Sequence, residues 1–415
     1  MIQLSRRRKW HGLSRCLIGW LVVGWLTHAD ARVRWSSPGS YRVRSIHTPA
    51  YQVDETGATV PDLSWLRHRL RLQPRVEVGP FAVFLELDVL TGQIYGDTTR
   101  FGDALTERRQ PEPSNEYDGW TTVEPRHAWM ELRFTHFDIR AGQMSRHWGL
   151  GLYAHDGDDR NRPPSWVLRP GDAWNGDIID SVEVTVRPFA TVSSNRLNGV
   201  SVRTAIGYVY QDENASTLGG DEASEFEAAL GYTSRRMQWA IHYLERTQTD
   251  RSGQFFNEEV FDAHLHWTIP LFLSNAELLI AGEALAISGE TSRRTTGNGQ
   301  PVSRRGYGGV IRAAIRWLCP RIAVGLDAGF LSGDDPKTSR DESLTSDPDY
   351  RVGFVFFREA LRSTSMQAGQ VLLAEDEEVS NALGSRNQPT DGALRNALFF
   401  SPGLTWRPLG LELGL

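Results

Sequence analysis

The chain has 415 residues, of which 23% are charged, and its formal net charge is −6. A mean hydropathy of −0.40 excludes a membrane protein built from several apolar helices, although strands that alternate apolar and polar residues also average to a polar value. The dispersed, mildly acidic charge gives no indication of nucleic-acid binding.

The N-terminal segment has the pattern of a secretory signal peptide. Basic residues at 6–9 precede an apolar run at 16–26, and residues 29–31 (Ala-Asp-Ala) offer a cleavage site. The apolar run is too short to span a bilayer as a helix. We therefore predict a signal peptide over 1–31 and a single domain over 32–415, with a retained signal anchor as the alternative.

Removal of residues 1–31 would leave Cys319 as the last of the two cysteines. No disulfide framework is then expected. An exported chain without disulfides is ordinary for a bacterial envelope protein.

The first clear strands lie in LRHRLRLQPRVEVGPFAVFLELDV, residues 66–89. Apolar residues alternate with charged ones on both sides of Gly79-Pro80, and side chains alternate across a strand. We predict a hairpin with one apolar face, in which a two-residue turn pairs Arg71 with Asp88. The charged face carries Arg67, Arg69, Arg71 and Arg75 on the first strand and Glu86 and Asp88 on the second.

The same pattern recurs at HAWMELRF, residues 127–134, followed by THFDIRAGQ. A turn at Thr135-His136 pairs Arg133 with Asp138 and Glu131 with Arg140. Opposite charges again meet on one face, which supports the predicted register.

Alternating segments continue to the end of the chain, and most have the length that a tilted strand needs to cross hydrocarbon. Short connections alternate with long polar ones, which is typical of an outer-membrane barrel. The further segments are 41–46, 178–187, 198–211, 225–233, 237–246, 260–269, 275–287, 308–317, 322–331 and 396–407. The predicted long loops are 91–125, 148–177, 212–224, 247–258, 288–306 and 332–395.

Two interpretations of the arginine series remain open. It is either a cationic track that steers anions along a lumen, or a charge ladder neutralised by Glu86 and Asp88 on the next strand. Acids at the same strand parity, such as Glu183, Glu225 and Glu227, oppose a simple anion-selective pore.

Catalytic and metal-binding patterns are weak. The chain has no G-x-S-x-G motif and no phosphate-binding loop. HDGDD (155–159) and SGDD (332–335) are expected to be solvated acids of outer loops. His264 and His266 share the lumen parity of one strand, but a metal site there would need ligands from neighbouring strands. We predict no catalytic residues, no metal and no cofactor.

The segments AGQMSRHWGLGLYAHDGDD (141–159) and PDYRVGFVFFREAL (348–361) resemble those of large bacterial outer-membrane barrels of the porin and alginate-export type. The resemblance implies a transmembrane antiparallel up-and-down β-barrel of roughly 16–18 strands with a polar lumen. Such barrels usually end in Phe or Trp, whereas this chain ends in GLELGL. Either the sequence is incomplete at its C-terminus, or residues 410–415 form a weakened closing strand.

From this pattern we expect a channel in the outer membrane of a Gram-negative bacterium, in contact with membrane lipid and lipopolysaccharide. It would pass small solutes or an anionic polysaccharide, narrowed by a long loop such as 350–374. A barrel hydrolase acting at the cell surface, a structural or adhesive barrel, and a soluble β-sandwich are the alternatives. A homo-oligomer is left open.

Overall fold

The computed structural model describes most of the chain beyond residue 32. The described ranges are 33–52, 59–60, 63–96, 123–157, 176–191, 197–210, 222–249, 253–271, 275–295, 299–317, 322–334, 338–347, 349–350, 352, 393–406 and 413–414. The predicted signal peptide, residues 1–31, lies outside them.

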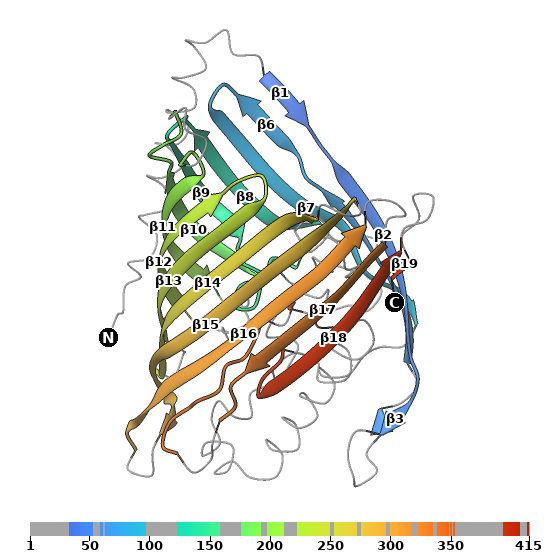
Figure 1. The fold of residues 1–415 in the computed structure, drawn as a ribbon, viewed down its shortest axis with the longest axis vertical. Coiled ribbons are helices and arrows are strands. Elements are labelled where there is room, and N and C mark those ends of the chain that lie inside the picture. Colours follow the sequence, from blue (N-terminus) through green and yellow to red (C-terminus); the bar gives the residue numbers. More distant parts are fainter. Residues whose placement is uncertain are drawn as a thin grey trace, which may run out of the picture.

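A 17-stranded antiparallel sheet dominates the fold, with a separate two-stranded sheet of β3 and β4 (Figure 1). The strands are β1 (Val33–Ser36), β2 (Gly39–Thr48), β3 (Tyr51–Gln52), β4 (Thr59–Val60), β5 (Leu63–Leu72), β6 (Arg75–Val78), β7 (Phe81–Gly96), β8 (Glu124–Arg133), β9 (Phe137–Ser145), β10 (Ile178–Val186), β11 (Val200–Tyr210), β12 (Glu222–Thr233), β13 (Met237–Thr249), β14 (Phe255–Leu271), β15 (Ala276–Thr295), β16 (Pro301–Trp317), β17 (Ile322–Leu331), β18 (Ala397–Trp406) and β19 (Leu413–Gly414).

From β7 to β18 each strand pairs with the strand that follows it in the chain. The sheet curls, and beyond this series β18 pairs with β19, while β7 pairs with β5 and β6, and β5 with β2 (Figure 1). The predicted all-β, up-and-down antiparallel architecture is therefore confirmed. None of the described residues belongs to a helix long and apolar enough to cross a membrane.

The first predicted hairpin is confirmed at its turn and changed along its length. Gly79 has a φ of 58°, and Val78 pairs with Phe81 as the two-residue turn requires. The predicted strand 66–78 is divided, because the chain leaves the sheet pattern at Gln73-Pro74 between β5 and β6. Proline has no N–H to donate to a neighbouring strand, which accounts for the break.

Several predicted long loops are shorter than expected. The sequence indicated a loop at 288–306, but β15 and β16 continue to pair as far as Thr295 and Pro301. Likewise β13 ends at Thr249 and β14 begins at Phe255. The extensions are rich in Thr, Ser, Arg and Glu, so the apolar alternation stops while the backbone pairing continues, since β-pairing does not require an apolar face.

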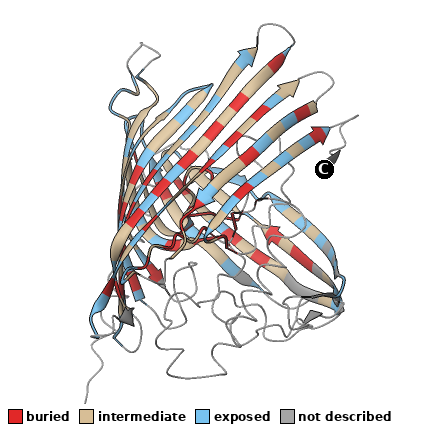
Figure 2. Ribbon diagram, turned by 60° about the horizontal axis from the view of Figure 1, so that its bottom comes forward, coloured by how far each residue is buried: buried red, intermediate tan, exposed pale blue. Residues whose placement is uncertain are grey.

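The two faces of the sheet differ in the way the alternation predicts, and buried and exposed residues alternate along the strands (Figure 2). Large apolar side chains are exposed on one face, and the buried charged side chains of the strands lie on the other. The exposed set includes Val202, Ile206, Phe226, Leu230, Ile241, Phe261, Leu265, Ile311, Val324, Leu326, Phe400 and Leu404.

One segment of the predicted outer loop 148–177 instead folds against the inner face of the sheet. In residues 146–157, here called the inward segment, Leu152 and Ala154 have no exposed surface and Trp148 is 1% exposed. They form the main apolar core of the described residues with inner-face residues of β13 to β18 and with Leu344, Tyr350 and Val352. The constriction predicted over 350–374 lies almost wholly outside the described residues.

Candidate functional site

Arg71 anchors a buried ion-pair cluster on the inner face of β5, β7 and β8. Its guanidinium donates two hydrogen bonds to Asp88, at 2.7 and 2.8 Å, and lies 3.2 Å from Glu86. The register pairs Arg71 with Asp88, as predicted from the Gly79-Pro80 turn. From β8, Arg126 and His127 reach Glu86 at 3.7 and 3.6 Å. The bidentate geometry and burial make this the most firmly held of the predicted charge pairs.

Of the other arginines in the predicted series, the structure describes the side chains of Arg69 and Arg75. Arg69 is buried, whereas the side chain of Arg67 lies outside the described residues. Arg75 stands apart on β6, where it contacts Glu77 of the same strand and lies over the ring of Phe84 at 4.4 Å. Arg75 therefore engages partners on its own hairpin rather than the Arg71 cluster.

The second hairpin has the predicted register, but only one of its two predicted ion pairs forms. Arg133 pairs in register with Asp138, and Glu131 with Arg140. Glu131 accepts a hydrogen bond from Arg140 at 3.0 Å, whereas Arg133 turns back to Glu131 of its own strand.

Asp138 instead binds a residue that the sequence analysis missed. It accepts two hydrogen bonds from Arg187, at 2.5 and 2.7 Å. Arg187 directly follows β10, whose last pair is Val186 with Phe137, so the strand pairing brings it next to Asp138. Arg187 lies outside the hairpin and reaches Asp138 only because β10 pairs with β9, so the sequence of the hairpin alone could not identify it.

Side chains of alternating charge lie in contact across the inner face from β8 to β12 and end at the imidazole of His242 on β13, a row here called the charge belt. Each strand contributes one member, and Arg203 and His242 sit diagonally to the acids before them. The contacts in strand order are Glu131–Arg140 (3.0 Å), Arg140–Glu183 (3.6 Å), Glu183–Arg203 (3.6 Å), Arg203–Glu227, and Glu227–His242 (3.8 Å).

The charge belt borders a cavity of about 250 Å³ inside the barrel. Arg140, Glu183 and Arg203 line its wall, and the inward segment closes another side. There Arg146 contacts Glu225, which also accepts a hydrogen bond from Arg246 at 2.9 Å. Burial alone would lower the pKa of Arg146, but the carboxylates of Glu225 and Asp177 raise it above the ordinary value, so this cation stays charged.

The inward segment is fixed by its own backbone and by the sheet. Gly149 and Gly151 adopt positive φ angles of 49° and 85°, and the Gly151 N–H donates to the Trp148 carbonyl at 2.7 Å. Glu283 of β15 accepts hydrogen bonds from the N–H groups of Leu150 and Leu152. These contacts hold a tight turn against the wall and narrow the interior.

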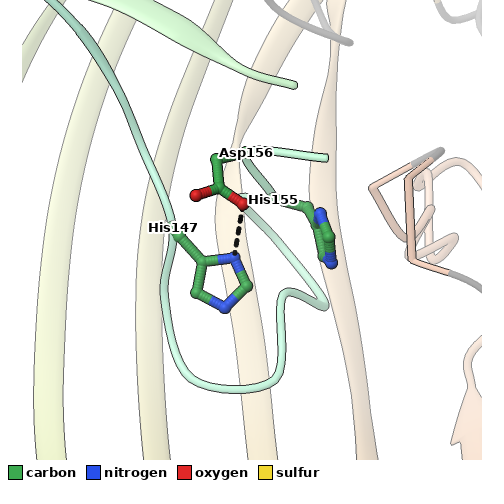
Figure 3. Close-up of side chains that lie close together, drawn as sticks. All are labelled: His147, His155 and Asp156. Atoms are coloured by element: carbon green, nitrogen blue, oxygen red, sulfur yellow. Dashed lines mark ion pairs between the residues drawn. The ribbon is translucent and has the colours of Figure 1, made fainter. Parts of the chain in front are cut away.

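His147, His155 and Asp156 come together on the inward segment (Figure 3). Nδ1 of His147 lies 3.7 Å from Asp156, and Nδ1 of His155 accepts a hydrogen bond from the Gly157 N–H at 2.8 Å. The side chain of Asp156 is only 15% exposed and contacts His147, so the prediction of a solvated outer-loop acid is wrong for this residue of HDGDD. Asp158 and Asp159 lie outside the described residues.

The described part of SGDD, residues 332–334, is likewise folded into the structure, and Asp335 lies outside the described residues. Ser332 is buried and donates to the carbonyl of Glu342 at 2.7 Å, while Asp334 accepts from the Glu342 N–H at 3.2 Å. This region packs against the extended ends of the strands, which explains why its polar residues find protein partners.

The apolar outer face, the charged inner face and the up-and-down order together define the fold class as a transmembrane antiparallel β-barrel of the outer-membrane type. Solved structures similar to the chain include the outer membrane channel DcaP of Acinetobacter baumannii, at 13% identity with a TM-score of 0.41, covering 74% of this chain and 81% of that one. OccK8 (OprE) of Pseudomonas aeruginosa matches at 9% identity with a TM-score of 0.43, covering 79% and 74%. OccAB1 of A. baumannii matches at 13% identity with a TM-score of 0.43, covering 74% and 68%.

Superpositions this loose carry no information on substrate or mechanism. No protein-family model matches the sequence, and no curated protein matches it.

Proposed function

We propose that the protein is an outer-membrane channel of a Gram-negative bacterium, through which small polar solutes diffuse along the charged inner wall of the barrel. Its apolar outer face would contact membrane lipid and lipopolysaccharide. The observation that carries the proposal is the charge belt beside the cavity, enclosed by a sheet whose outer face is apolar. Charges within the hydrocarbon region are tolerated when they face water or one another inside the barrel.

The mixed charge of the cavity favours weak ion selectivity. Its wall carries both arginines and acids: Arg140, Arg146 and Arg203, and Asp156, Glu183, Glu225 and Glu227. Because the two signs interleave, the field that would exclude one type of ion is largely cancelled. A small solute with both a positive and a negative group, or with many hydroxyl groups, fits this wall better than a highly charged polymer.

The inward segment supplies the narrowing that the proposal requires. It packs against one side of the wall through Trp148 and Leu152 and faces the cavity with Arg146, His147 and Asp156. We infer that solute passes between this segment and the charge belt. This assigns to residues 146–157 the role that the sequence analysis gave to a later loop.

Planar-bilayer recording tests the proposal. The protein refolded from detergent should give discrete conductance steps, and a KCl gradient across the bilayer should give a reversal potential close to zero. Heat-denatured protein is the control. Shifted gel migration before heating identifies the folded barrel. If the folded protein inserts into the bilayer but gives no conductance, the channel function is contradicted.

A further inference from the structure

Three potential metal ligands meet on the inner face at the border between the charge belt and the apolar core. His242 of β13 pairs directly with Asp262 of β14, and His264 follows two residues later on the same face. One ligand atom from each of these residues lies within 4.8 Å of the others. His242 and Asp262 are buried, and His264 is half-buried.

Each residue of this cluster has at least one buried polar atom without a hydrogen-bond partner. Nε2 of His242, Nδ1 of His264 and both carboxylate oxygens of Asp262 are buried without one. Buried polar groups are nearly always satisfied, because an unpaired one loses its hydration without compensation. Unpaired nitrogen and oxygen atoms on three residues whose ligand atoms lie within 4.8 Å of one another indicate a missing partner that accepts electron pairs from both elements.

The charge of the site points to a cation. Glu283 of β15 pairs in register with His264, and its carboxyl group lies within hydrogen-bonding reach of Asp262. Within the described part of the chain, neither Asp262 nor Glu283 forms an ion pair with arginine or lysine. Glu283 is already engaged by the N–H groups of Leu150 and Leu152. Asp262 is therefore the carboxylate whose charge most needs a counter-ion.

We propose that His242, Asp262 and His264 bind a divalent transition-metal ion, with Zn²⁺ as the best match to two imidazoles and one carboxylate. Nε2 of His242, Nδ1 of His264 and an oxygen of Asp262 are the ligand atoms. Binding at Nε2 places the remaining proton of His242 on Nδ1, which faces Glu227 at 3.8 Å. A carboxylate behind a ligating histidine orients the ring in this manner. Arg203 lies 3.3 Å from the same nitrogen and can only donate, so on metal binding it would turn fully to Glu227, which it already contacts.

A metal ion at this site would link β13 and β14 to the inward segment. Trp148 stacks on the ring of His242 at 4.8 Å with an interplanar angle of 20°. Glu283, next to Asp262, holds the backbone of the same segment. A metal ion that fixes His242 and Asp262 would thus also fix the position of Trp148.

Equilibrium dialysis with Zn²⁺ tests the site. Protein without a histidine tag is refolded in detergent, stripped with EDTA and dialysed against Zn²⁺, and bound metal is measured by atomic absorption. We expect one Zn²⁺ per chain in the unmodified protein. Asp262→Asn and His264→Gln should each weaken binding by about tenfold or more.

His266→Gln is the matched control. His266 lies on the same strand and face, and its buried Nε2 also lacks a partner, but it is not in the cluster. This variant should bind Zn²⁺ as the unmodified protein does. Gel migration before and after heating checks that each variant is folded, and the absorption spectrum of bound Co²⁺ in the unmodified protein reports histidine ligation without any variant.

Two results would overturn the proposal. If the unmodified protein binds no Zn²⁺ above background, Asp262 and Glu283 share a proton instead of a metal ion. If His266→Gln loses as much Zn²⁺ as His264→Gln, the ion sits elsewhere. Neither result bears on conductance, so the site and the channel can fail independently.

Discussion

The inner wall of the barrel carries different residue types in two halves, β8–β12 and β13–β18. Over β8–β12 the inner positions carry the charge belt and border the cavity. Over β13–β18 many of them are apolar, among them Leu244, Val260 and Leu285, and they pack against the inward segment. Both halves have the same apolar outer face. The residue types on the inner face therefore match what lies against them. At β8–β12 this is the cavity and other charged side chains, and at β13–β18 it is the folded inward segment.

The largest difference between the two halves is expected when one aromatic ring is removed from each. Trp148 is almost fully buried in the apolar half, whereas Trp129, stacked on Phe84 at 3.9 Å, lines the cavity. Trp148→Ala should lower the free energy of opening the inward segment by about 3–5 kcal/mol, because it leaves a cavity in a packed core. Hydrogen exchange at residues 148–154 measures this.

Trp129→Ala is the matched variant and should change exchange at residues 148–154 little. Conductance should rise in Trp148→Ala, since the narrowing segment is released. Equal exchange in the two variants would show that the two halves do not differ in packing.

The loss of unfolding free energy when an ion pair is removed should likewise depend on how deeply the pair is buried. Arg71→Leu leaves Asp88 and Glu86 buried without their main cation, which should cost about 3–5 kcal/mol of unfolding free energy. The side chain of Arg140 is 40% exposed, and its buried partner Glu131 keeps its contact with Arg133, so Arg140→Gln should cost no more than about 1 kcal/mol. Urea unfolding in lipid vesicles compares them, and similar losses would mean that the charge belt is as tightly packed as the Arg71 cluster.

Substitutions of apolar residues on the outer face should cost the same stability in both halves. Ile206 is 62% exposed on β11, and Ile311 is 64% exposed on β16. Changing either to Arg should cost about 2–4 kcal/mol if the residue lies near the middle of the bilayer. Ile206→Leu and Ile311→Leu are the controls and should be nearly neutral. A large cost in only one half would mean that the other half does not face lipid.

The sequence was most informative where the determinants are local. Alternation and the Gly79-Pro80 turn were enough to predict the register that joins Arg71 to Asp88. The division at Gln73-Pro74 was missed because the apolar parity continues through it. The strands also run past the end of their apolar pattern, as β15 and β16 do.

The inward segment could not be predicted because its partners are distant in the chain. Leu150 and Leu152 bind Glu283, which lies more than 130 residues away. A usable signal was nevertheless present, since Leu285 and Ile287 put apolar side chains on the face that should meet water. Apolar residues on both faces of a barrel strand predict that protein covers the inner one. The same reasoning explains His242 and Asp262, which only the pairing of β13 with β14 brings together.

The smallest expected effect tests whether the charge belt governs ion passage. Arg203→Gln removes one positive charge between Glu183 and Glu227 at the cavity wall, so the lumen becomes more negative. The reversal potential in a KCl gradient should shift toward cation selectivity, with a loss of only about 1 kcal/mol in stability because the pair is partly exposed. Glu183→Gln should shift the reversal potential the opposite way. If neither variant shifts it, ions do not pass along the belt, and the conducting path must be sought away from the β8–β12 half of the wall.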